Sequence, residues 1–307
     1  KNKDAVRTGR VRALCALARA SGGSSWLLTG TPLKNRPPDL YSLLTIAGLT
    51  GETWPEFRGF ARDFGGVWRS VARGRKAWAW DGEVARHVPE VLRRVMFRRE
   101  KQDVLHELPP KRWEDEEVSI PGSALKHANA ALAALSSAGI DLATATAESI
   151  RHAANMPGFE EISRAFAALA AAKLPAALDV AEGHAFAAGS PPLVWSRHVA
   201  PLKGVAKHFG WPLIVGGVGS TARSDIERRF QAGDYGGLCL SIGAASTAIT
   251  LTAADRAFFI DLAWTPTDNE QAEDRMHRIG QFNPCTYTRL VADHVLGRRQ
   301  CELLSEK

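Results

Sequence analysis

The sequence predicts an α/β protein with a parallel sheet, and two features of its second half carry that prediction. Short apolar or β-branched runs recur between residues 191 and 307, each bounded by turn residues. Amphipathic stretches with helical spacing separate several of these runs, notably at 224–231 and 268–279. Strands and helices that alternate at this spacing favour βαβ units and hence a parallel sheet.

The apolar runs of this half are the expected strands. They lie at 193–198, 212–218, 237–243, 257–262 and 286–292. In a parallel sheet, ligands bind where the loops leave the C-terminal ends of the strands. The loops that follow these runs are therefore where a binding site is expected.

The first half has weaker signals. The segment SWLLTGTP (25–32) is expected to be a short strand that enters a turn, with a helix from Pro38 to Ala47 after it. In KAWAWDGE (76–83), Trp alternates with Ala before an Asp-Gly pair, which suggests a β-hairpin. Residues 122–188 are rich in Ala, and their larger apolar residues have the spacing of packed helices.

Composition narrows the class of protein. A net charge of +6 and a pI of about 9.3 favour acidic partners such as nucleic acid, although weakly. No apolar run approaches the roughly 18 residues of a membrane span. The four cysteines form no CxxC pair, so we expect reduced thiols and no metal site. A cytoplasmic location is expected, at the nucleoid in a bacterium or phage and in the nucleus in a eukaryote.

The segment QAEDRMHRIGQ (271–281) is the strongest candidate for chemistry. On a helix, Gln271, Arg275 and Arg278 would share one face at i, i+4 and i+7. Two guanidiniums on one face can clamp phosphate oxygens, and an Arg at a transferring phosphoryl group stabilises the transition state. The alternative is a solvated helix face whose charges pair locally.

Two charged segments have open interpretations. A basic cluster interleaves with three tryptophans and comprises Arg69, Arg73, Arg75 and Lys76 beside Trp68, Trp78 and Trp80. Cations and flat rings suit a nucleic-acid surface, but an exposed loop beside a Trp-packed hairpin would look the same. The acidic stretch EDEEV (114–118) has no apolar strand before it, so it is expected to be solvated rather than metal-binding.

Four segments together resemble one family. QAEDRMHRIGQ is similar to motif VI of the SWI/SNF-type DNA-dependent ATPases of helicase superfamily two, and TGTPLKN (29–35) resembles their motif III region. RREKQDVLHELPPK (98–111) is similar to the segment after the first lobe, and LTAADRAFFIDLAWTP (251–266) to motif V and its extension. The order and spacing match the family over nearly the whole chain, with WDGE closest to the annealing-helicase branch.

The resemblance implies two RecA-like lobes, each a parallel sheet flanked by helices, with ATP between them and DNA across both. On this basis we expect residues 1–112 to be the later half of an incomplete first lobe with a small insertion. Residues 113–160 would form the linker and helical connection, within the Ala-rich stretch, and 161–307 a complete second lobe. The implied activity is that of an ATPase that translocates on double-stranded or forked DNA.

The resemblance also assigns residues. Arg278 would be the arginine finger, with Arg275 as the second catalytic residue and Gln271 binding ATP beside both. The expected DNA contacts are Thr31, Lys34, Asn35, Thr250 and Trp264. Trp264 could instead cap a core, and Lys34 could be a solvated loop lysine. Ser196 and His198 stand where motif IV ends its strand.

The chain departs from the family in two places. No G-x-x-x-x-G-K-[ST] loop and no DEAH-type box occur, so the ligands of Mg²⁺ are expected upstream of Lys1. The missing half could be a separate chain, and this chain alone is expected to be inactive. The glycine run of motif V is replaced by Ala245-Ser246-Thr247-Ala248, which limits the backbone. These departures favour the rival interpretation of a non-enzymatic DNA-binding or scaffold module.

Overall fold

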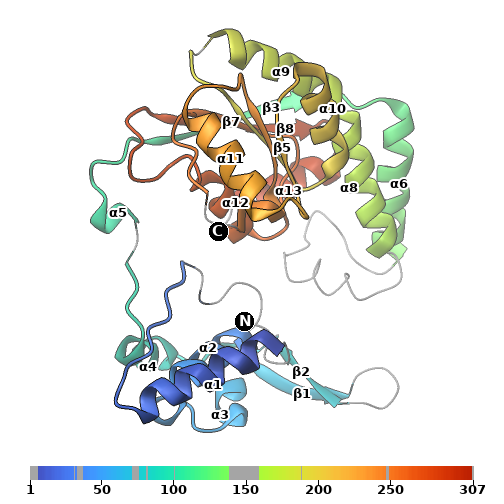
Figure 1. Cartoon of the computed structure of the whole chain (residues 1–307). Coiled ribbons are helices and arrows are strands. Elements are labelled where there is room, and N and C mark those ends of the chain that lie inside the picture. The colour runs from blue at the N-terminus through green and yellow to red at the C-terminus, as the bar shows by residue number, and fades with distance from the viewer. Residues whose placement is uncertain are drawn as a thin grey trace. The chain divides into compact units, whose positions relative to one another are not determined.

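The computed structural model describes residues 6–30, 32, 37–70, 76–80, 82–99, 101–137, 159–187, 189–246 and 249–305. The chain forms two compact units, Lys1–Val104 and Leu105–Lys307 (Figure 1). We call them unit 1 and unit 2 and describe each by itself.

Unit 1 consists of short helices around an aromatic core, with a two-stranded hairpin. Its helices are α1 (Val6–Ala20), α2 (Pro37–Ala47), η1 (Thr50–Glu52), α3 (Phe57–Asp63), α4 (Val88–Val95) and α5 (Lys101–Val104). The expected helix from Pro38 is confirmed as α2. Trp54, Phe60 and Phe64 form the centre of the core, where Phe60 and Phe64 stack with ring centroids 4.3 Å apart.

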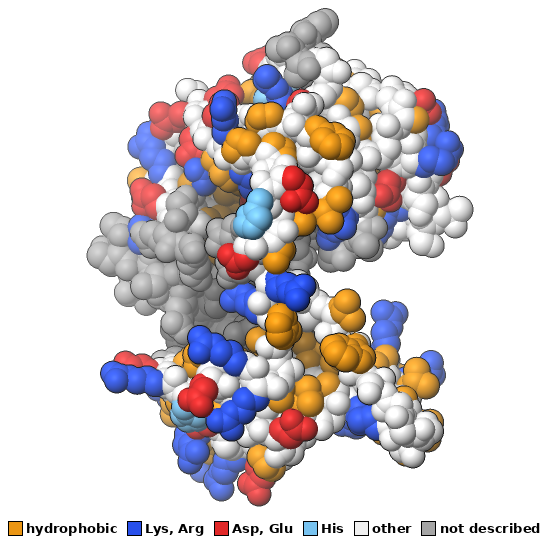
Figure 2. All heavy atoms as spheres, turned by 90° about the vertical axis from the view of Figure 1, so that its left-hand side faces the viewer, with side chains coloured by type: hydrophobic (Ala, Val, Ile, Leu, Met, Phe, Trp, Pro, Cys, Tyr) orange, Lys and Arg blue, Asp and Glu red, His pale blue; other side chains and the backbone are white. Residues whose placement is uncertain are grey.

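The expected strand at 25–32 is wrong. Residues 24–29 have no strand partner, and the side chains of Trp26 and Leu28 are 85% and 91% exposed. A strand needs a neighbour for its backbone N–H and C=O groups, and the described part of unit 1 offers none here. Helix α1 likewise buries none of its residues. Figure 2 shows hydrophobic side chains exposed among Lys and Arg on the lower unit.

A hairpin forms near the predicted place but with a different partner. Strand β1 (Gly66–Ser70) pairs antiparallel with β2 (Lys76–Trp80), so the partner precedes the KAWAW strand and Gly82 lies at the open end. There the Gly82 N–H donates to the Gly65 carbonyl at 2.9 Å. Gly65 has a φ of +71°, a conformation that favours glycine.

Unit 2 is built on a six-stranded parallel sheet with the order β3-β8-β7-β4-β6-β5. The strands are β3 (Lys111–Val118), β4 (Leu193–Ser196), β5 (Leu213–Ile214), β6 (Leu238–Ser241), β7 (Arg256–Phe259) and β8 (Cys285–Ala292). All five expected strands are confirmed. The acidic residues 114–117 are exposed as expected and Val118 is buried, but the whole stretch belongs to edge strand β3, which pairs with β8 along its whole length. An edge strand tolerates such charges because they stay in water.

Helices cover both faces of this sheet. On one face α9 (Leu174–Ala187) and α10 (Val199–Phe209) pack over side chains such as Val194. On the other face α11 (Ser220–Gln231), α12 (Pro266–Glu273) and the end of α13 (Val295–Ser305) pack with Leu193 and Trp195. All four residues of β4 are buried, as expected for a central parallel strand.

The Ala-rich stretch is helical as predicted. Helix α6 (Gly122–Ser137) packs against α8 (Phe159–Ala172), and the pair closes onto Leu296 of α13. Helix α6 and most of strand β3 fall in the expected connection 113–160, and both join the sheet and core of unit 2. None of the described helices is both long and apolar enough to cross a membrane.

Candidate functional site

The loop that carries the two candidate arginines, residues 274–281, is not helical. Helix α12 ends at Glu273, so the expected helix through 279 is wrong. The Arg275 N–H bonds to the Ala272 carbonyl at 3.2 Å and the Met276 N–H to the Glu273 carbonyl at 3.0 Å. These bonds reach three residues back, whereas the N–H groups of Asp274 and His277 still reach four residues back, so the segment is a series of turns and no continuous helix. Gln271 therefore stays on the helix, whereas turns position the arginines in what we call the arginine loop.

Tertiary anchors hold the arginine loop in this form. Met276 is fully buried in the core, and the Arg275 carbonyl accepts a hydrogen bond from the Leu251 N–H at 2.8 Å. The buried Gln281 donates to the carbonyls of Ala254 and Thr252 at 2.7 and 3.3 Å. These bonds fix both ends of the loop against residues 249–254, which belong to the motif V region.

The two guanidiniums lie in one electrostatic environment. Arg275 is half-buried, and its Nε is buried without a hydrogen-bond partner within the described chain. Burial lowers the pKa of Arg275, and the nearby charge of Arg278 lowers it further, against smaller opposing effects of Asp274 and Glu227. Two like charges close together, one of them short of hydrogen bonds, are suited to an anion with several oxygen atoms.

Arg278 also contacts an expected DNA-binding residue. Its Nη1 donates to the Ile249 carbonyl at 3.2 Å and to Thr250 Oγ1 at 3.1 Å. The Thr250 N–H in turn donates to Glu227 Oε1 at 2.6 Å. Because both bonds of Arg278 come from Nη1, the other edge of its guanidinium makes no hydrogen bond within the described residues.

The segment that ends in ELPPK is attached to the arginine loop. Lys111 forms ion pairs with Glu273 at 3.1 Å and Asp274 at 3.2 Å, and His277 Nε2 donates to the Pro109 carbonyl at 2.7 Å. Burial raises the pKa of Glu273 against the effect of Lys111. Burial also disfavours the charge of Lys111, but the two carboxylates outweigh it and its pKa is raised. Two of the motifs that the sequence singled out thus meet in one structural unit.

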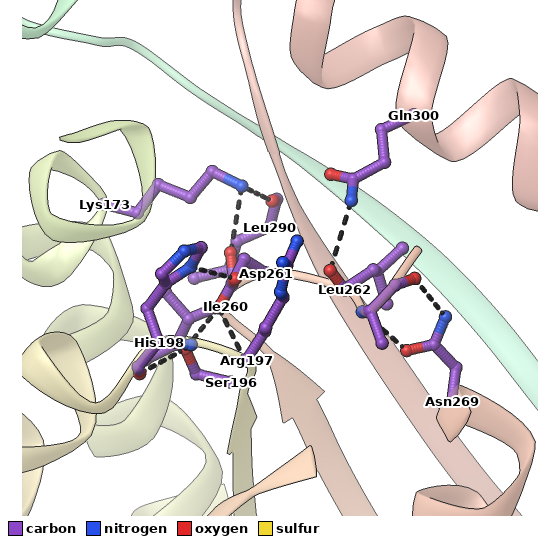
Figure 3. Close-up of polar contacts among 11 residues, drawn as sticks. Lys173, Ser196, Arg197, His198, Ile260, Asp261, Leu262, Asn269, Leu290 and Gln300 are labelled. Carbon is purple, nitrogen blue, oxygen red and sulfur yellow. Dashed lines mark hydrogen bonds and ion pairs between the residues drawn. The ribbon is translucent and has the colours of Figure 1, made fainter. Parts of the chain in front are cut away.

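A second polar cluster lies at the C-terminal ends of β4 and β7 (Figure 3). Ser196 ends β4, as expected, and Asp261 follows the adjacent β7. Asp261 accepts hydrogen bonds from Ser196 Oγ, from the Arg197 N–H at 3.0 Å and from His198 Nδ1 at 2.6 Å. The single Ser196 O–H faces two acceptors, Asp261 and the His198 carbonyl, and no bond joins Ser196 Oγ to the His198 ring, so this is a positioning network and no nucleophilic triad.

The same cluster fixes the loop that follows β7. The buried Lys173 Nζ donates to the carbonyls of Ile260 and Leu290, and burial lowers the pKa of Lys173 although Asp261 opposes this. Gln300 Nε2 donates to the Leu262 carbonyl at 3.1 Å, and the Asn269 amide exchanges two hydrogen bonds with the backbone of Ala263. Gln300, Leu262 and Asn269 are labelled in Figure 3.

The sequence did not single out Lys173, Asp261, Asn269 or Gln300. The one available signal was the position of Lys173, a single cation in the apolar run AAAKLPAAL (170–178). Buried polar side chains that bind backbone carbonyls are recognisable only when the loop they bind is known.

The remaining residues that were expected to contact DNA are Trp264, Thr31, Lys34 and Asn35. The Trp264 ring packs edge-on against Phe166 at 4.8 Å and is partly buried, which matches the core-capping alternative. Its DNA contact stays a prediction. Thr31, Lys34 and Asn35 lie outside the described residues. Within the part of the chain that the structure describes, no three His, Cys, Asp or Glu residues gather as they would around a metal ion.

Unit 2 is thus a parallel α/β unit whose arginine loop contacts Lys111, the first residue of β3, and the segment that leads into β7, and this arrangement fits a helicase-like domain. Two families match the chain: the SNF2-related domain over residues 3–127 and the helicase conserved C-terminal domain over residues 193–280. The chain therefore belongs to the SWI/SNF-type, SNF2-related family of helicase-like proteins.

Individual relatives agree with this family. "SWI/SNF-related matrix-associated actin-dependent regulator of chromatin subfamily A-like protein 1" of Xenopus tropicalis is 29% identical over 94% of this chain and 30% of its own. "DNA annealing helicase and endonuclease ZRANB3" of Mus musculus is 30% identical over 92% of this chain and 26% of its own. This chain thus spans between a quarter and a third of the length of these relatives.

Among solved structures, the chain is similar to the C-terminal part of the Fun30 ATPase domain. It has a TM-score of 0.48 and 14% sequence identity, and the match covers 64% of this chain and 89% of that one.

Proposed function

We propose that this chain is part of a DNA-dependent ATPase that translocates on double-stranded DNA. The single observation that carries the proposal is the arginine loop, where half-buried Arg275 and adjacent Arg278 have no carboxylate partner in hydrogen-bond contact within the described residues. Their guanidiniums would bind phosphate oxygens of ATP, with Arg278 as the arginine finger and Gln271 beside them. The family of the chain and its annealing-helicase relatives support this assignment.

The donors present fit a polyphosphate rather than a metal ion. The buried, unpartnered Nε of Arg275 requires an acceptor, and a phosphate oxygen supplies one. Mg²⁺ bound to the triphosphate would neutralise part of the phosphate charge. The described residues of this chain offer no ligand set for that ion. The contribution of this chain is to hold the phosphates and to place positive charge where negative charge develops.

The bond between Arg278 and Thr250 supports a link to DNA. Thr250 is one of the proposed DNA contacts, together with Thr31, Lys34, Asn35 and Trp264. If Arg278 turns towards a bound phosphate, the bond from its Nη1 to Thr250 and Ile249 must stretch or rearrange. The occupancy of the arginine loop would then be communicated to a residue at the DNA. Contacts of this kind to the backbone carry no sequence information.

Binding assays with variants of the arginine loop test this proposal. Fluorescent ATP and tripolyphosphate should bind to the unaltered chain and lose about tenfold or more in affinity in the double variant Arg275→Ala/Arg278→Ala, because charged hydrogen bonds are strong. Arg229→Ala is the matched control, since Arg229 is exposed and already paired with Asp234 at 3.2 Å. Equal binding by all three proteins would refute the assignment of the phosphate site.

A second experiment measures the binding of DNA by the chain. Binding of two unrelated duplexes should weaken steeply as salt rises and should differ little between them, because phosphate contacts release counterions. Strongly sequence-selective or salt-insensitive binding would contradict the translocase. DNA binding that survives without any phosphate binding at the arginine loop would instead favour the non-enzymatic module.

A further inference from the structure

The hairpin β1–β2 has one tryptophan that the core does not explain. The rings of Trp78 and Trp80 each lie 6.2 Å from Phe57, a residue packed on the core of unit 1. Trp68 lies opposite Trp78, on strand β1. Its ring contacts Trp78 at 5.1 Å, and the residue remains 51% exposed. The aromatic row therefore extends from the core into solvent and ends in an indole that is available to a ligand.

The register of the hairpin places cations beside this indole. Trp68 lies opposite Trp78, and the next pair on the same face is Ser70 opposite Lys76. Arg69 is on the other face, opposite Ala77, and both basic residues are exposed. Residues 66–80 contain four basic side chains and no acidic one. A partner with negative charge and a flat apolar surface is the chemical complement of this arrangement.

We propose that the hairpin binds an unpaired strand of DNA, with one base stacked on Trp68 and an adjoining phosphate near Lys76. The bases of an intact duplex are already stacked on each other, so an exposed indole stacks on an unpaired base. This inference rests on the proposed function for the nature of the nucleic acid. It adds a site on unit 1 that is separate from the arginine loop of unit 2 and has its own preference for single strands.

Binding of oligothymidylate by the whole chain tests the site. Anisotropy titrations would use a labelled single strand of about 12 nucleotides, a length within the usual site sizes, and a duplex of equal length. Trp68→Ala should weaken binding of the single strand by about fivefold or more, the lower end of what one stacked base contributes, and leave the duplex nearly unaffected. Trp68→Phe keeps a ring and should retain most of the affinity.

Two controls make the result specific. Phe97→Ala removes another exposed aromatic residue of unit 1, 86% exposed, and should change neither affinity. Lys76→Ala should weaken binding of the single strand and reduce its dependence on salt, because one phosphate contact is lost.

The outcomes separate this inference from the proposed function. If Trp68→Ala binds the single strand as the unaltered chain does, or if Trp68→Phe loses as much as Trp68→Ala, stacking on Trp68 is overturned while the arginine loop is untouched. Equal losses for single strand and duplex would also overturn it. Loss of phosphate binding in the arginine variants, with single-strand binding intact, would support both assignments independently.

Discussion

Arg278 lies close to a second arginine and is bonded to the segment 249–254. Its Nη1 is engaged with Ile249 and Thr250, while Arg275 beside it has a buried Nε without a partner among the described residues. A half-buried guanidinium next to a second one is electrostatically unfavourable until an anion arrives. A phosphate bound at the arginine loop, as we propose, would relieve this repulsion.

This predicts the effect of Arg278→Ala in a longer protein that also contains a P-loop and a DEAH-type box. Turnover of ATP should fall by about 10³–10⁵-fold, as for arginine fingers in general, while ATP binding largely survives. A phosphate-release assay with DNA and Mg²⁺ measures this. A loss of less than about tenfold in a folded variant would show that Arg278 lies outside the reacting centre.

Lys173 is the residue that fixes the loop after β7 to the Ala-rich helices. Its Nζ is buried and bonds to two backbone carbonyls from neighbouring strands. Lys173→Ala should therefore destabilise unit 2 by about 2–4 kcal/mol, because it leaves a cavity and unpaired carbonyls. Urea unfolding followed by circular dichroism measures this. Lys203→Ala, at an exposed position of α10, should stay within about 0.5 kcal/mol of the unaltered chain.

At the scale of elements, the hairpin depends on a close backbone approach. A Cβ on Gly65 would lie 2.1 Å from the Gly82 carbonyl oxygen, and Gly65 has a positive φ. If a side chain at residue 65 pushed Gly65 and Gly82 apart, strands β1 and β2 could not keep the pairing that is observed. The hairpin that presents Trp68 is therefore held at its base by two glycines.

Gly65→Ala should cost unit 1 at least about 2 kcal/mol, since both the clash and the backbone conformation oppose it. Gly59→Ala is the matched control on the adjoining helix α3. A Cβ at Gly59 meets nothing within 4 Å, and Ala is the better helix former, so this change should be neutral or stabilising by up to about 1 kcal/mol. Thermal melts of the two variants give the comparison, and an unaffected Gly65→Ala would refute the close contact.

Helix α3 ends in a carboxylate that ties the core of unit 1 together. Asp63 accepts hydrogen bonds from Trp54 Nε1 at 2.9 Å and His87 Nε2 at 3.0 Å. Burial alone would raise the pKa of Asp63, but these bonds and one from Arg62 outweigh it, so the pKa is lowered.

A pH titration tests this arrangement. Because the folded pKa lies below the unfolded value, the contribution of Asp63 is fully present above about pH 4 and is lost as the pH falls through the folded pKa. Unit 1 should therefore lose melting temperature in acid, and Asp63→Asn should be less stable at pH 7 and show a smaller loss. An Asn variant with the same acid dependence as the unaltered chain would contradict this assignment.

At the scale of the molecule, the two compact units divide after Val104. Unit 2 includes β3, which completes the sheet edge beside β8, and α6, which covers α8. Lys111 and Pro109 further attach the start of this unit to the arginine loop. The connection between the lobes is thus partly an integral piece of the second one.

Two shortened chains test this division. The piece 105–307 should unfold cooperatively by itself, whereas 160–307 should be markedly less stable, because it loses an edge strand and exposes the core formed by α6 and α8. Urea titrations and limited proteolysis of both pieces decide the matter. A 160–307 piece as stable as the longer one would show that β3 and α6 are peripheral.

The amino-acid sequence by itself determined the α/β class, the five apolar strands of unit 2, the Ala-rich helices and the family. These features depend on local apolar patterns and on motifs such as QAEDRMHRIGQ, which are readable along the chain. The acidic strand β3 was missed, because its charges obey the pattern of a solvated loop and only its pairing with β8 makes it a strand.

Only the tertiary structure decided the form of the site. The segment around Arg275 has a helical pattern, yet it turns because Met276 is drawn into the core and Leu251 binds the Arg275 carbonyl. Asp261, Lys173 and Gln300 meet at the strand ends from distant parts of the chain. The strand expected at 25–32 did not form, because the described part of unit 1 offers no neighbouring strand to pair with its backbone. Long-range contacts override local preference wherever burial or a backbone partner is at stake.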